Sequence, residues 1–332
     1  MKKISFVVPN AYNNNKIFDL EDPFFNRDDC LRPYLLMKEE FERLGYQIET
    51  SDLISPHEAD VVLYNEMPAK METPKEKSYL MIFESELIRP DNWDKNKHEN
   101  FHKIFTWNDE YVDNKKYFKF NFPNNFSTPA LGTQGRERLA VLISGNKTSN
   151  HPLELYSKRL DTIKWFEKFH VSEFDYYGFG WDKHNFGSQT IGKILNKLGA
   201  YKFLPKRMTP CYKGIVDSKN ETLKSYKFCI CYENARDIAG YITEKIFDCF
   251  FAGTIPVYWG PNNRDLHIPS SCYIDRTDFA SHEEMYEFLT NLSDNVYLNY
   301  QKEIIKYLES DQAEQFKADY FAKTITGQVT SE

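Results

Sequence analysis

The stretch YKFCICYENARDIAGYITEKIFDCFFAGTIPVYWGP, residues 226–261, decides the fold of this chain. It holds an apolar run at 228–232, a helix-like run at 243–253 and a second apolar run at 254–260. Apolar runs of this length on either side of a helix are typical of buried parallel strands joined by a helical crossover. The stretch therefore predicts one strand–helix–strand unit of an α/β sheet.

The same alternation of strands and helices continues on both sides of this stretch. Nearby, the sequence predicts strands at 138–146, 174–181 and 272–275, a helix at 151–169, a short helix near 219–227, and a helical tail from 281. Further upstream lie predicted strands at 3–9, 46–52, 59–66, 77–85 and 102–109, and a helix at 31–45 that ends at Gly45. Such a pattern favours largely parallel sheets with helical crossovers.

A cluster of Asn, Pro, Gly, Ser and Thr at 121–137 interrupts this alternation and marks a linker. We therefore expect an N-terminal α/β domain at 1–125, a linker at 126–137, a C-terminal Rossmann-like domain at 138–310 and a helical tail at 311–332. The expected fold class is α/β, with two facing Rossmann-like domains and a cleft between them. In open α/β sheets, ligands bind outside the carboxyl ends of the strands.

Polar residues stand where the first apolar run of the opening stretch ends. Glu233 and Asn234 follow it directly, and a loop with Gly240 leads to the next helix. Thr243 is suited to cap that helix, and Lys245 lies in its first turn. The free N–H groups of a helix start, its positive dipole end and an ammonium group together suit a diphosphate. The alternative is a capped surface helix whose charged side chains are solvated.

Composition and charge exclude several classes of protein. The net charge of −7 argues against a general nucleic-acid binder, which needs a basic footprint. No stretch approaches the 18 apolar residues of a transmembrane helix. No Asp-x-Asp motif occurs, and the H-E-x-x-H string at 98–102 runs straight into a predicted strand instead of lying on a helix. The sequence therefore predicts no bound metal.

The opening stretch resembles the donor-binding signature of the α-1,3/4-fucosyltransferases, glycosyltransferase family 10. The matching residues follow F-x-[IL]-x-x-E-N, Y-[IV]-T-E-K-[IL] and G-T-[IV]-P-[IV]-Y-W-G, with Ala235 where many members carry Ser or Thr. The resemblance implies a GT-B fold of two Rossmann-like domains and a bacterial-type member. It also implies inverting transfer of L-fucose from GDP-β-L-fucose to a glycan hydroxyl, α-1,3 or α-1,4 to N-acetylglucosamine.

The resemblance also assigns donor-binding roles to residues of the second domain. Lys245 is expected to hold the diphosphate, and Glu244 to bond hydroxyls of the donor sugar or ribose. The family uses an arginine early in the helix after the second domain's first strand; Arg159 matches it best, and Lys158 is the alternative. The full expected donor set is Arg159, Glu233, Asn234, Tyr241, Thr243, Glu244, Lys245 and, ranked lower, Lys219.

The acceptor hydroxyl needs a general base, because a sugar alcohol is a poor nucleophile. The segment TWNDEYV at 106–112 follows a predicted strand of the first domain and carries an acidic pair. By resemblance Glu110 is expected to be the base, with Asp109 as the alternative; a solvated loop acid is the competing interpretation. Cationic groups would replace a metal, so no cofactor is expected, and Mn²⁺ would at most stimulate.

Two other functions stay open: transfer from another nucleotide sugar, and a catalytically silent sugar-nucleotide-binding protein. The expected partners are a nucleotide-sugar donor and an oligosaccharide or lipid-linked glycan acceptor, and no nucleic acid. With no export signal and no transmembrane segment, a cytoplasmic location is expected, with peripheral contact at the inner membrane face. Residues 183–227 hold ten Lys or Arg against two Asp or Glu, which predicts either a lid over the donor or a solvated face.

Overall fold

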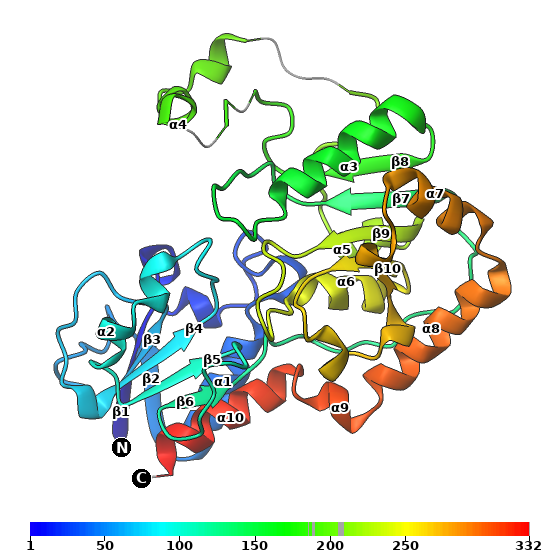
Figure 1. The fold of residues 1–332 in the computed structure, drawn as a ribbon. Helices are drawn as coiled ribbons and strands as arrows, with labels where there is room; N and C mark the ends of the chain where they lie inside the picture. The colour runs from blue at the N-terminus through cyan, green and yellow to red at the C-terminus, as the bar shows by residue number, and fades with distance from the viewer. Residues whose placement is uncertain (185, 188–189, 205–208, 332) are drawn as a thin grey trace. The chain divides into compact units, whose positions relative to one another are not determined.

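The computed structural model describes residues 1–184, 186–187, 190–204 and 209–331. They divide into two compact α/β units. The first unit comprises Met1–Phe126, Ala239–Glu244 and Ser310–Glu332, and the second comprises Ser127–Ile238 and Lys245–Glu309. Figure 1 shows that each unit is built on a sheet of its own.

The first unit contains a six-stranded sheet in the order β2-β1-β3-β4-β5-β6, and every neighbouring pair is parallel. Parallel strands need apolar residues on both faces, which the runs of this half supply. The sequence did not predict β6, because it is three residues long and only half-buried. The strands are β1 (Lys2–Val7), β2 (Tyr46–Thr50), β3 (Val61–Asn65), β4 (Ser78–Ile82), β5 (Lys103–Thr106) and β6 (Tyr117–Lys119).

The C-terminal helix completes the first unit. Its helices are α1 (Arg32–Arg43), α2 (Lys95–His98), α9 (Asp311–Glu314) and α10 (Ala318–Thr330). Helix α10 packs on α1, and the ring of Phe321 contacts Tyr34 and Phe83. The connections β2–β3 and β3–β4 contain no α-helix, contrary to the expected helical crossovers. Helix α10, at the C-terminal end of the chain, packs on this unit, so the tail predicted at 311–332 is part of the first unit.

The second unit contains a five-stranded parallel sheet in the order β11-β10-β9-β7-β8. Its strands are β7 (Arg138–Ile143), β8 (Phe174–Tyr177), β9 (Tyr226–Tyr232), β10 (Ile255–Trp259) and β11 (Ile274–Asp275). Helix α6 (Glu244–Ala252) joins β9 to β10, as the opening stretch predicts, and Gly253 ends it with a left-handed φ of +67°. Only a residue without a side chain adopts that conformation cheaply.

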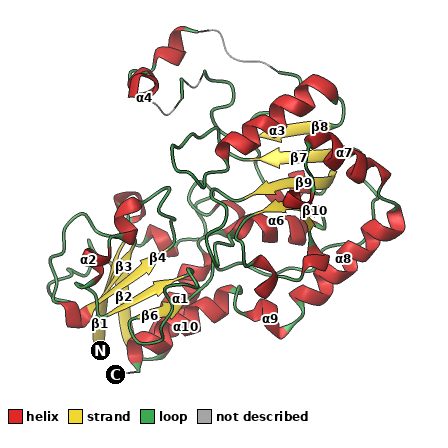
Figure 2. Ribbon diagram, in the orientation of Figure 1, coloured by secondary structure: helices red, strands yellow, loops and turns green. Residues whose placement is uncertain are grey.

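The other helices of the second unit surround this sheet. They are α3 (Tyr156–Phe169), α5 (Lys219–Leu223), α7 (His282–Asn291) and α8 (Asp294–Leu308), and a further helix, α4 (Thr190–Lys197), stands apart from the yellow strands in Figure 2. One buried apolar cluster, with Phe166, Ile230, Val257 and Met285 among its members, joins the sheet to α3 and α7. The prediction of two parallel-sheet α/β domains is thus confirmed. No helix in the described ranges has both the length and the apolar character needed to cross a bilayer.

Candidate functional site

The second sheet has its topological switch point between β7 and β9. The chain runs from β7 to β8 on one side and then returns to β9 on the other side of β7. At such a point the connections leave the strand ends in opposite directions, which opens a crevice for ligands. Glu233 and Asn234 follow the last residue of β9 and therefore stand at this crevice.

Glu233 and Lys245 form an ion pair at the end of β9. Lys245 Nζ lies 3.4 Å from Glu233 Oε2, and the Tyr258 hydroxyl donates to Glu233 Oε1 at 3.1 Å. The Glu233 side chain is fully buried, whereas that of Lys245 is 23% exposed. A buried carboxylate requires such partners because burial without them is costly. The pair therefore fixes an ammonium group at the first turn of α6, where it is accessible to an anion.

Arg159 ties helix α3 to the same strand end. Its Nη2 donates to the backbone oxygen of Tyr232 at 2.6 Å and to Asn234 Oδ1 at 3.1 Å. The Arg159 residue is only 3% exposed, whereas the side chain of the alternative, Lys158, is 50% exposed and lies 3.9 Å from Asp161. The structure thus brings Arg159 and Asn234 together and places Lys158 on the surface.

The residues before α6 belong to the first unit. Gly240 has a φ of +79°, and a Cβ at this position would lie 2.3 Å from the backbone oxygen of Trp107. The next residue, Tyr241, is buried, with its ring centroid 4.6 Å from that of Trp107. Thr243 is buried directly before the helix, which begins at the half-buried Glu244. Tyr241, Thr243 and Glu244 thus belong to the first unit, and the second unit resumes at Lys245, the next residue of α6.

Lys219 lies at the start of α5 and contacts α6. Its Nζ is 2.8 Å from Asp248 Oδ2, one helical turn beyond Lys245. Helix α5 precedes β9, so Lys219 contacts α6 from the amino end of that strand, whereas Glu233 and Asn234 follow its carboxyl end. The role of Lys219 in donor binding stays a prediction.

Arg276 is a cation that the sequence analysis did not select. It follows β11 directly, its Nε donates to the Tyr232 hydroxyl at 3.1 Å, and its guanidinium stacks 5.8 Å from the ring centroid of Trp259. Burial raises the pKa of Tyr232, and the Arg276 charge opposes that rise. Its position after a short predicted strand was the only available signal, because no motif marks it.

Carboxylates gather at the carboxyl edge of the first sheet. Glu66 follows β3, Glu84 lies two residues after β4, and Asp109 and Glu110 follow β5. Glu66 has a φ of +76°, a strained conformation for a residue with a side chain. Its Oε1 accepts from the backbone N–H groups of Phe83 at 3.2 Å and Glu84 at 2.9 Å. The Glu66 carboxylate therefore fixes the backbone at Glu84, which the sequence analysis did not consider.

Asp109 and Glu110 differ in their surroundings. Asp109 Oδ1 accepts a hydrogen bond from Lys119 Nζ at 2.6 Å, and Lys119 also donates to the backbone oxygen of Trp107 at 2.5 Å. Burial lowers the pKa of Lys119, and Asp109 opposes that shift. Glu110 is exposed, and its backbone N–H donates to Asn108 Oδ1. Asp109 is thus held in an ion pair, whereas the Glu110 side chain faces solvent.

The burial of Glu66 makes stability depend on pH. Burial raises the pKa of its carboxyl from 4.5 to about 7, against hydrogen bonds from Glu84 N–H and Asn92 Nδ2. A raised pKa means that the folded state binds the proton more tightly than the unfolded state between these values. The free energy of unfolding should therefore fall as the pH rises from about 4.5 to about 7, by about 3 kcal/mol at most.

In Glu66→Gln this contribution is absent, so the thermal midpoint should vary less across that pH range than in the wild type. Melting curves recorded at intervals from pH 4.5 to 8 compare the two slopes, and Glu58→Gln, an exposed acid of the same unit, is the control. Parallel slopes for Glu66→Gln and wild type would show that Glu66 does not titrate in this range.

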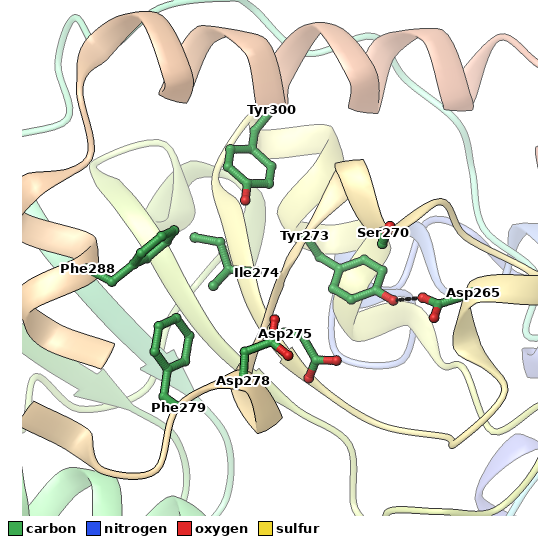
Figure 3. Close-up of a pocket in the computed structure, with 9 residues that line it drawn as sticks. All are labelled: Asp265, Ser270, Tyr273, Ile274, Asp275, Asp278, Phe279, Phe288 and Tyr300. Atoms are coloured by element: carbon green, nitrogen blue, oxygen red, sulfur yellow. Dashed lines mark hydrogen bonds between the residues drawn. The ribbon is translucent and has the colours of Figure 1, made fainter. Parts of the chain in front are cut away.

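A cavity of 390 Å³ lies beside β11 and α8 in the second unit, and Figure 3 shows its lining residues. Three carboxylates stand in its wall; Asp275 is paired with Arg264, and Asp265 accepts from the Tyr273 hydroxyl. A wall of this charge repels a diphosphate. None of the predicted donor residues lines the cavity; the lining comprises Asp265, Ser270, Tyr273, Ile274, Asp275, Asp278, Phe279, Phe288 and Tyr300.

The H-E-x-x-H string does not form the helix that a zinc site requires. His98 Nδ1 lies 3.0 Å from the Tyr117 hydroxyl and its Nε2 lies 2.7 Å from the backbone oxygen of Asn92. Helix α2 ends at His98, so His102 is not on the same helical face. Over the residues that the structure describes, no group of three or more His, Cys, Asp or Glu is arranged to hold a metal. The basic stretch at 183–227 includes 185, 188–189 and 205–208, which lie outside the described residues.

Comparison with known proteins identifies relatives of this chain. The family model "Glycosyltransferase family 10 (fucosyltransferase) C-term" matches residues 157–323. An α-(1,3)-fucosyltransferase of Helicobacter pylori is 37% identical over 86 residues, which are 25% of this chain and 18% of that protein. The 4-galactosyl-N-acetylglucosaminide 3-α-L-fucosyltransferase 9 of Mus musculus is 36% identical over 91 residues, 26% of this chain and 25% of that protein. The matched stretch therefore spans a quarter or less of these relatives.

Solved structures share the fold over nearly the whole chain. A crystal structure of an α1,3-fucosyltransferase with GDP-fucose aligns with a TM-score of 0.53 at 15% identity, over 99% of this chain and 90% of that one. An α-glucosyltransferase in complex with UDP and DNA aligns with a TM-score of 0.56 at 11% identity, over 99% of both chains. The fold is thus that of GT-B glycosyltransferases. Because the family model covers half of the chain, the resemblance of residues 226–261 is confirmed, and the chain belongs to glycosyltransferase family 10, the fucosyltransferases.

Proposed function

We propose that this protein transfers L-fucose from GDP-β-L-fucose to a hydroxyl of a glycan acceptor, with inversion at the anomeric carbon. The observation that carries the proposal is the ammonium of Lys245, fixed by buried Glu233 at the start of α6 beside a switch point, in a family 10 chain. We infer an α-1,3 or α-1,4 linkage to N-acetylglucosamine, because the mouse relative is named for 3-fucosyl transfer to that sugar and an Arabidopsis thaliana relative is named for α-1,4 transfer.

The reaction needs stabilisation of negative charge on the leaving GDP and removal of the proton from the acceptor hydroxyl. The acceptor oxygen attacks C1 of fucose, the bond from C1 to the phosphate oxygen breaks, and GDP leaves with one additional negative charge. Lys245, the positive dipole end of α6 and the cation Arg276, which donates to the Tyr232 hydroxyl, are suited to stabilise that charge. Arg159, being buried, is suited to hold Asn234 and the end of β9 in place.

A carboxylate of the first unit is the proposed general base. Glu110 is the base expected from the sequence, and we propose Glu84 as a second candidate, because both follow parallel strands at the same sheet edge. The base takes the acceptor proton as the new glycosidic bond forms. A single carboxylate with no covalent intermediate gives one displacement, so a β-linked donor yields an α-fucoside.

The experiment that tests this function is a donor and product assay. The purified protein is incubated with GDP-fucose, GDP-mannose, UDP-glucose and UDP-galactose in the presence of N-acetyllactosamine. We expect turnover with GDP-fucose alone, and an NMR spectrum of the product with an α-anomeric fucose signal. Turnover with another donor would show that the protein is a glycosyltransferase that transfers a sugar other than fucose. GDP binding without turnover on a panel of acceptors would favour a catalytically silent sugar-nucleotide-binding protein.

We further expect transfer without a metal. The sequence has no Asp-x-Asp motif, and the cations around the switch point can stabilise the leaving diphosphate. Excess EDTA should therefore change the initial rate by less than about twofold, and Mn²⁺ should at most stimulate. Loss of activity in EDTA that Mn²⁺ alone restores would contradict this expectation.

A further inference from the structure

Helix α4 of the second unit carries an exposed apolar stripe. Ile191 is 74% exposed, Ile194 is 52% exposed, and Leu198, just beyond the helix end, is 74% exposed. These positions are spaced i, i+3 and i+7, so they lie on one face of the helix. In Figure 1 this helix stands clear of the sheet of its unit, at the top of the view.

The opposite face of α4 packs against its own segment. A Cβ on Gly192 would lie 2.2 Å from the backbone oxygen of Phe186, so the helix and this loop are in close contact. Asn196 bonds the same loop, accepting from Phe186 N at 3.1 Å and donating to Gly187 O at 3.2 Å. These contacts turn the face with Ile191, Ile194 and Leu198 toward solvent.

Further apolar side chains continue this surface along the chain. Phe203 ends the short 3₁₀ helix η6 (Ala200–Phe203) and is 88% exposed, and Leu204 after it is also exposed. Single exposed apolar residues are ordinary, but a run of them on one short segment marks an interaction surface. We call Ile191, Ile194, Leu198, Phe203 and Leu204 the α4 surface.

The segment that carries the α4 surface is basic, whereas the whole protein is acidic. Residues 190–204 contain three Lys and no Asp or Glu, and the chain has a net charge of −7. Lys197 and Lys202 are exposed and stand in sequence between the apolar members of the surface. Lysines beside an apolar stripe complement the phosphates and acyl chains of an anionic lipid headgroup layer.

The helical tail does not offer a similar surface. In α10 the apolar side chains of Phe321, Ala322, Ile325 and Val329 are buried, and the helix packs on α1. Its apolar face is therefore already covered by the first unit. The α4 surface has the amphipathic, basic character that the tail lacks.

We propose that the α4 surface docks on the surface of an anionic lipid bilayer. The Ile191, Ile194, Leu198 and Phe203 side chains enter the interface, and the flanking lysines contact headgroup phosphates. Apolar burial and electrostatic attraction then act together, which is how amphipathic segments without a spanning helix bind membranes. This inference is independent of the proposed transfer reaction and would place the protein where lipid-linked acceptors occur.

Sedimentation with lipid vesicles tests the inference directly. We expect the whole protein to bind vesicles that contain phosphatidylglycerol and to remain in solution with pure phosphatidylcholine. The double variant Ile191→Asp/Leu198→Asp should bind at least about tenfold more weakly, because two carboxylates would have to enter the interface. Leu266→Asp is the matched control: that residue is also 74% exposed and lies outside the segment, so its binding should equal that of the wild type.

A second experiment tests the electrostatic contribution of the lysines to vesicle binding. Lys197→Glu/Lys202→Glu should weaken binding to phosphatidylglycerol vesicles, and so should about 1 M NaCl, at which the screening length falls to about 3 Å. Wild-type protein that stays in solution with these vesicles would overturn the proposal, as would a double aspartate variant that binds normally. If the wild type does not bind vesicles and the aspartate variant loses affinity for GDP, the segment is instead a lid over the donor. Thermal midpoints within a degree or two of the wild type would show that each variant is folded.

Discussion

Lys245→Ala is expected to lower kcat/KM for GDP-fucose by about 10³-fold, the largest effect of any single substitution that the structure suggests. The leaving GDP gains a negative charge as the bond to fucose breaks, and Lys245 is the accessible ammonium at the α6 start. Its Nζ lies 3.4 Å from the buried Glu233 carboxylate, which positions the ammonium before the reaction and reduces the reorganisation that it needs. Steady-state kinetics with varied GDP-fucose measure the loss in kcat and in KM. Calorimetric titration of GDP measures how much affinity for the nucleotide is lost.

The same substitution also removes the partner of a buried carboxylate. Glu233 is fully buried, and without Lys245 it would keep only the Tyr258 hydroxyl among the partners described above. Breaking such a pair costs on the order of 3–5 kcal/mol of stability, so the thermal midpoint of Lys245→Ala should fall. The double variant Glu233→Gln/Lys245→Gln replaces the pair by neutral groups. It should recover the midpoint while staying inactive.

Two further variants test whether the effect depends on a positive charge at position 245 or on positive charge elsewhere in the second unit. Lys245→Arg keeps the positive charge and should retain more activity than Lys245→Ala. Lys158→Ala removes an exposed cation of α3 and should change kcat/KM by less than about threefold, because exposed pairs contribute little. A folded Lys245→Ala protein with nearly normal kinetics would contradict the proposal that Lys245 stabilises the leaving GDP. A large loss of activity in Lys158→Ala would assign that role to Lys158.

Glu84→Gln is expected to lower kcat by about 10²-fold or more while the affinity for GDP stays unchanged. A general base must be held in a defined position, and the Glu84 backbone is fixed at two points. Its N–H donates to Glu66 Oε1 at 2.9 Å, and its backbone oxygen accepts from the Trp93 indole at 3.0 Å. Initial rates with saturating GDP-fucose and acceptor, with GDP titrations alongside, measure the effect.

Glu110→Gln is the comparison that decides between the two candidates. Glu110 is the base expected from the sequence, but its side chain is exposed in the structure, so we expect a loss below about tenfold. Asp109→Asn removes an ion pair with Lys119 and should mainly affect stability. If Glu110→Gln lost about 10²-fold in kcat and Glu84→Gln did not, the base would be Glu110.

Residues that are close in the sequence account for much of what could be predicted. The strand–helix–strand unit of residues 226–261 was predicted with its boundaries within two residues, since its apolar runs, Gly253 and the polar residues between them are consecutive. The same stretch indicated that Glu233 and Lys245 belong to one site, because a strand end and the helix after it meet at one sheet edge.

Other parts of the site depend on contacts between distant residues. The Glu66 carboxylate accepts from backbone groups at 83 and 84, and no periodicity in the sequence relates these positions. Arg276, 44 positions away in the sequence, donates to the Tyr232 hydroxyl from the turn that follows β11. The segment at 239–244 lies in the signature stretch and yet belongs to the first unit, where Gly240 and Tyr241 pack on Trp107.

The sequence by itself determined the class of fold, the family signature and the cation at the start of α6. The spacing of apolar residues and the residue types that begin a helix are local properties, which can be read from consecutive residues. Only the tertiary structure decided which cations are buried, which carboxylates share the edge of the first sheet, and that α10 packs on α1. The physical reason is that burial and ion pairing depend on which strands and helices pack together, and those contacts join residues up to hundreds of positions apart.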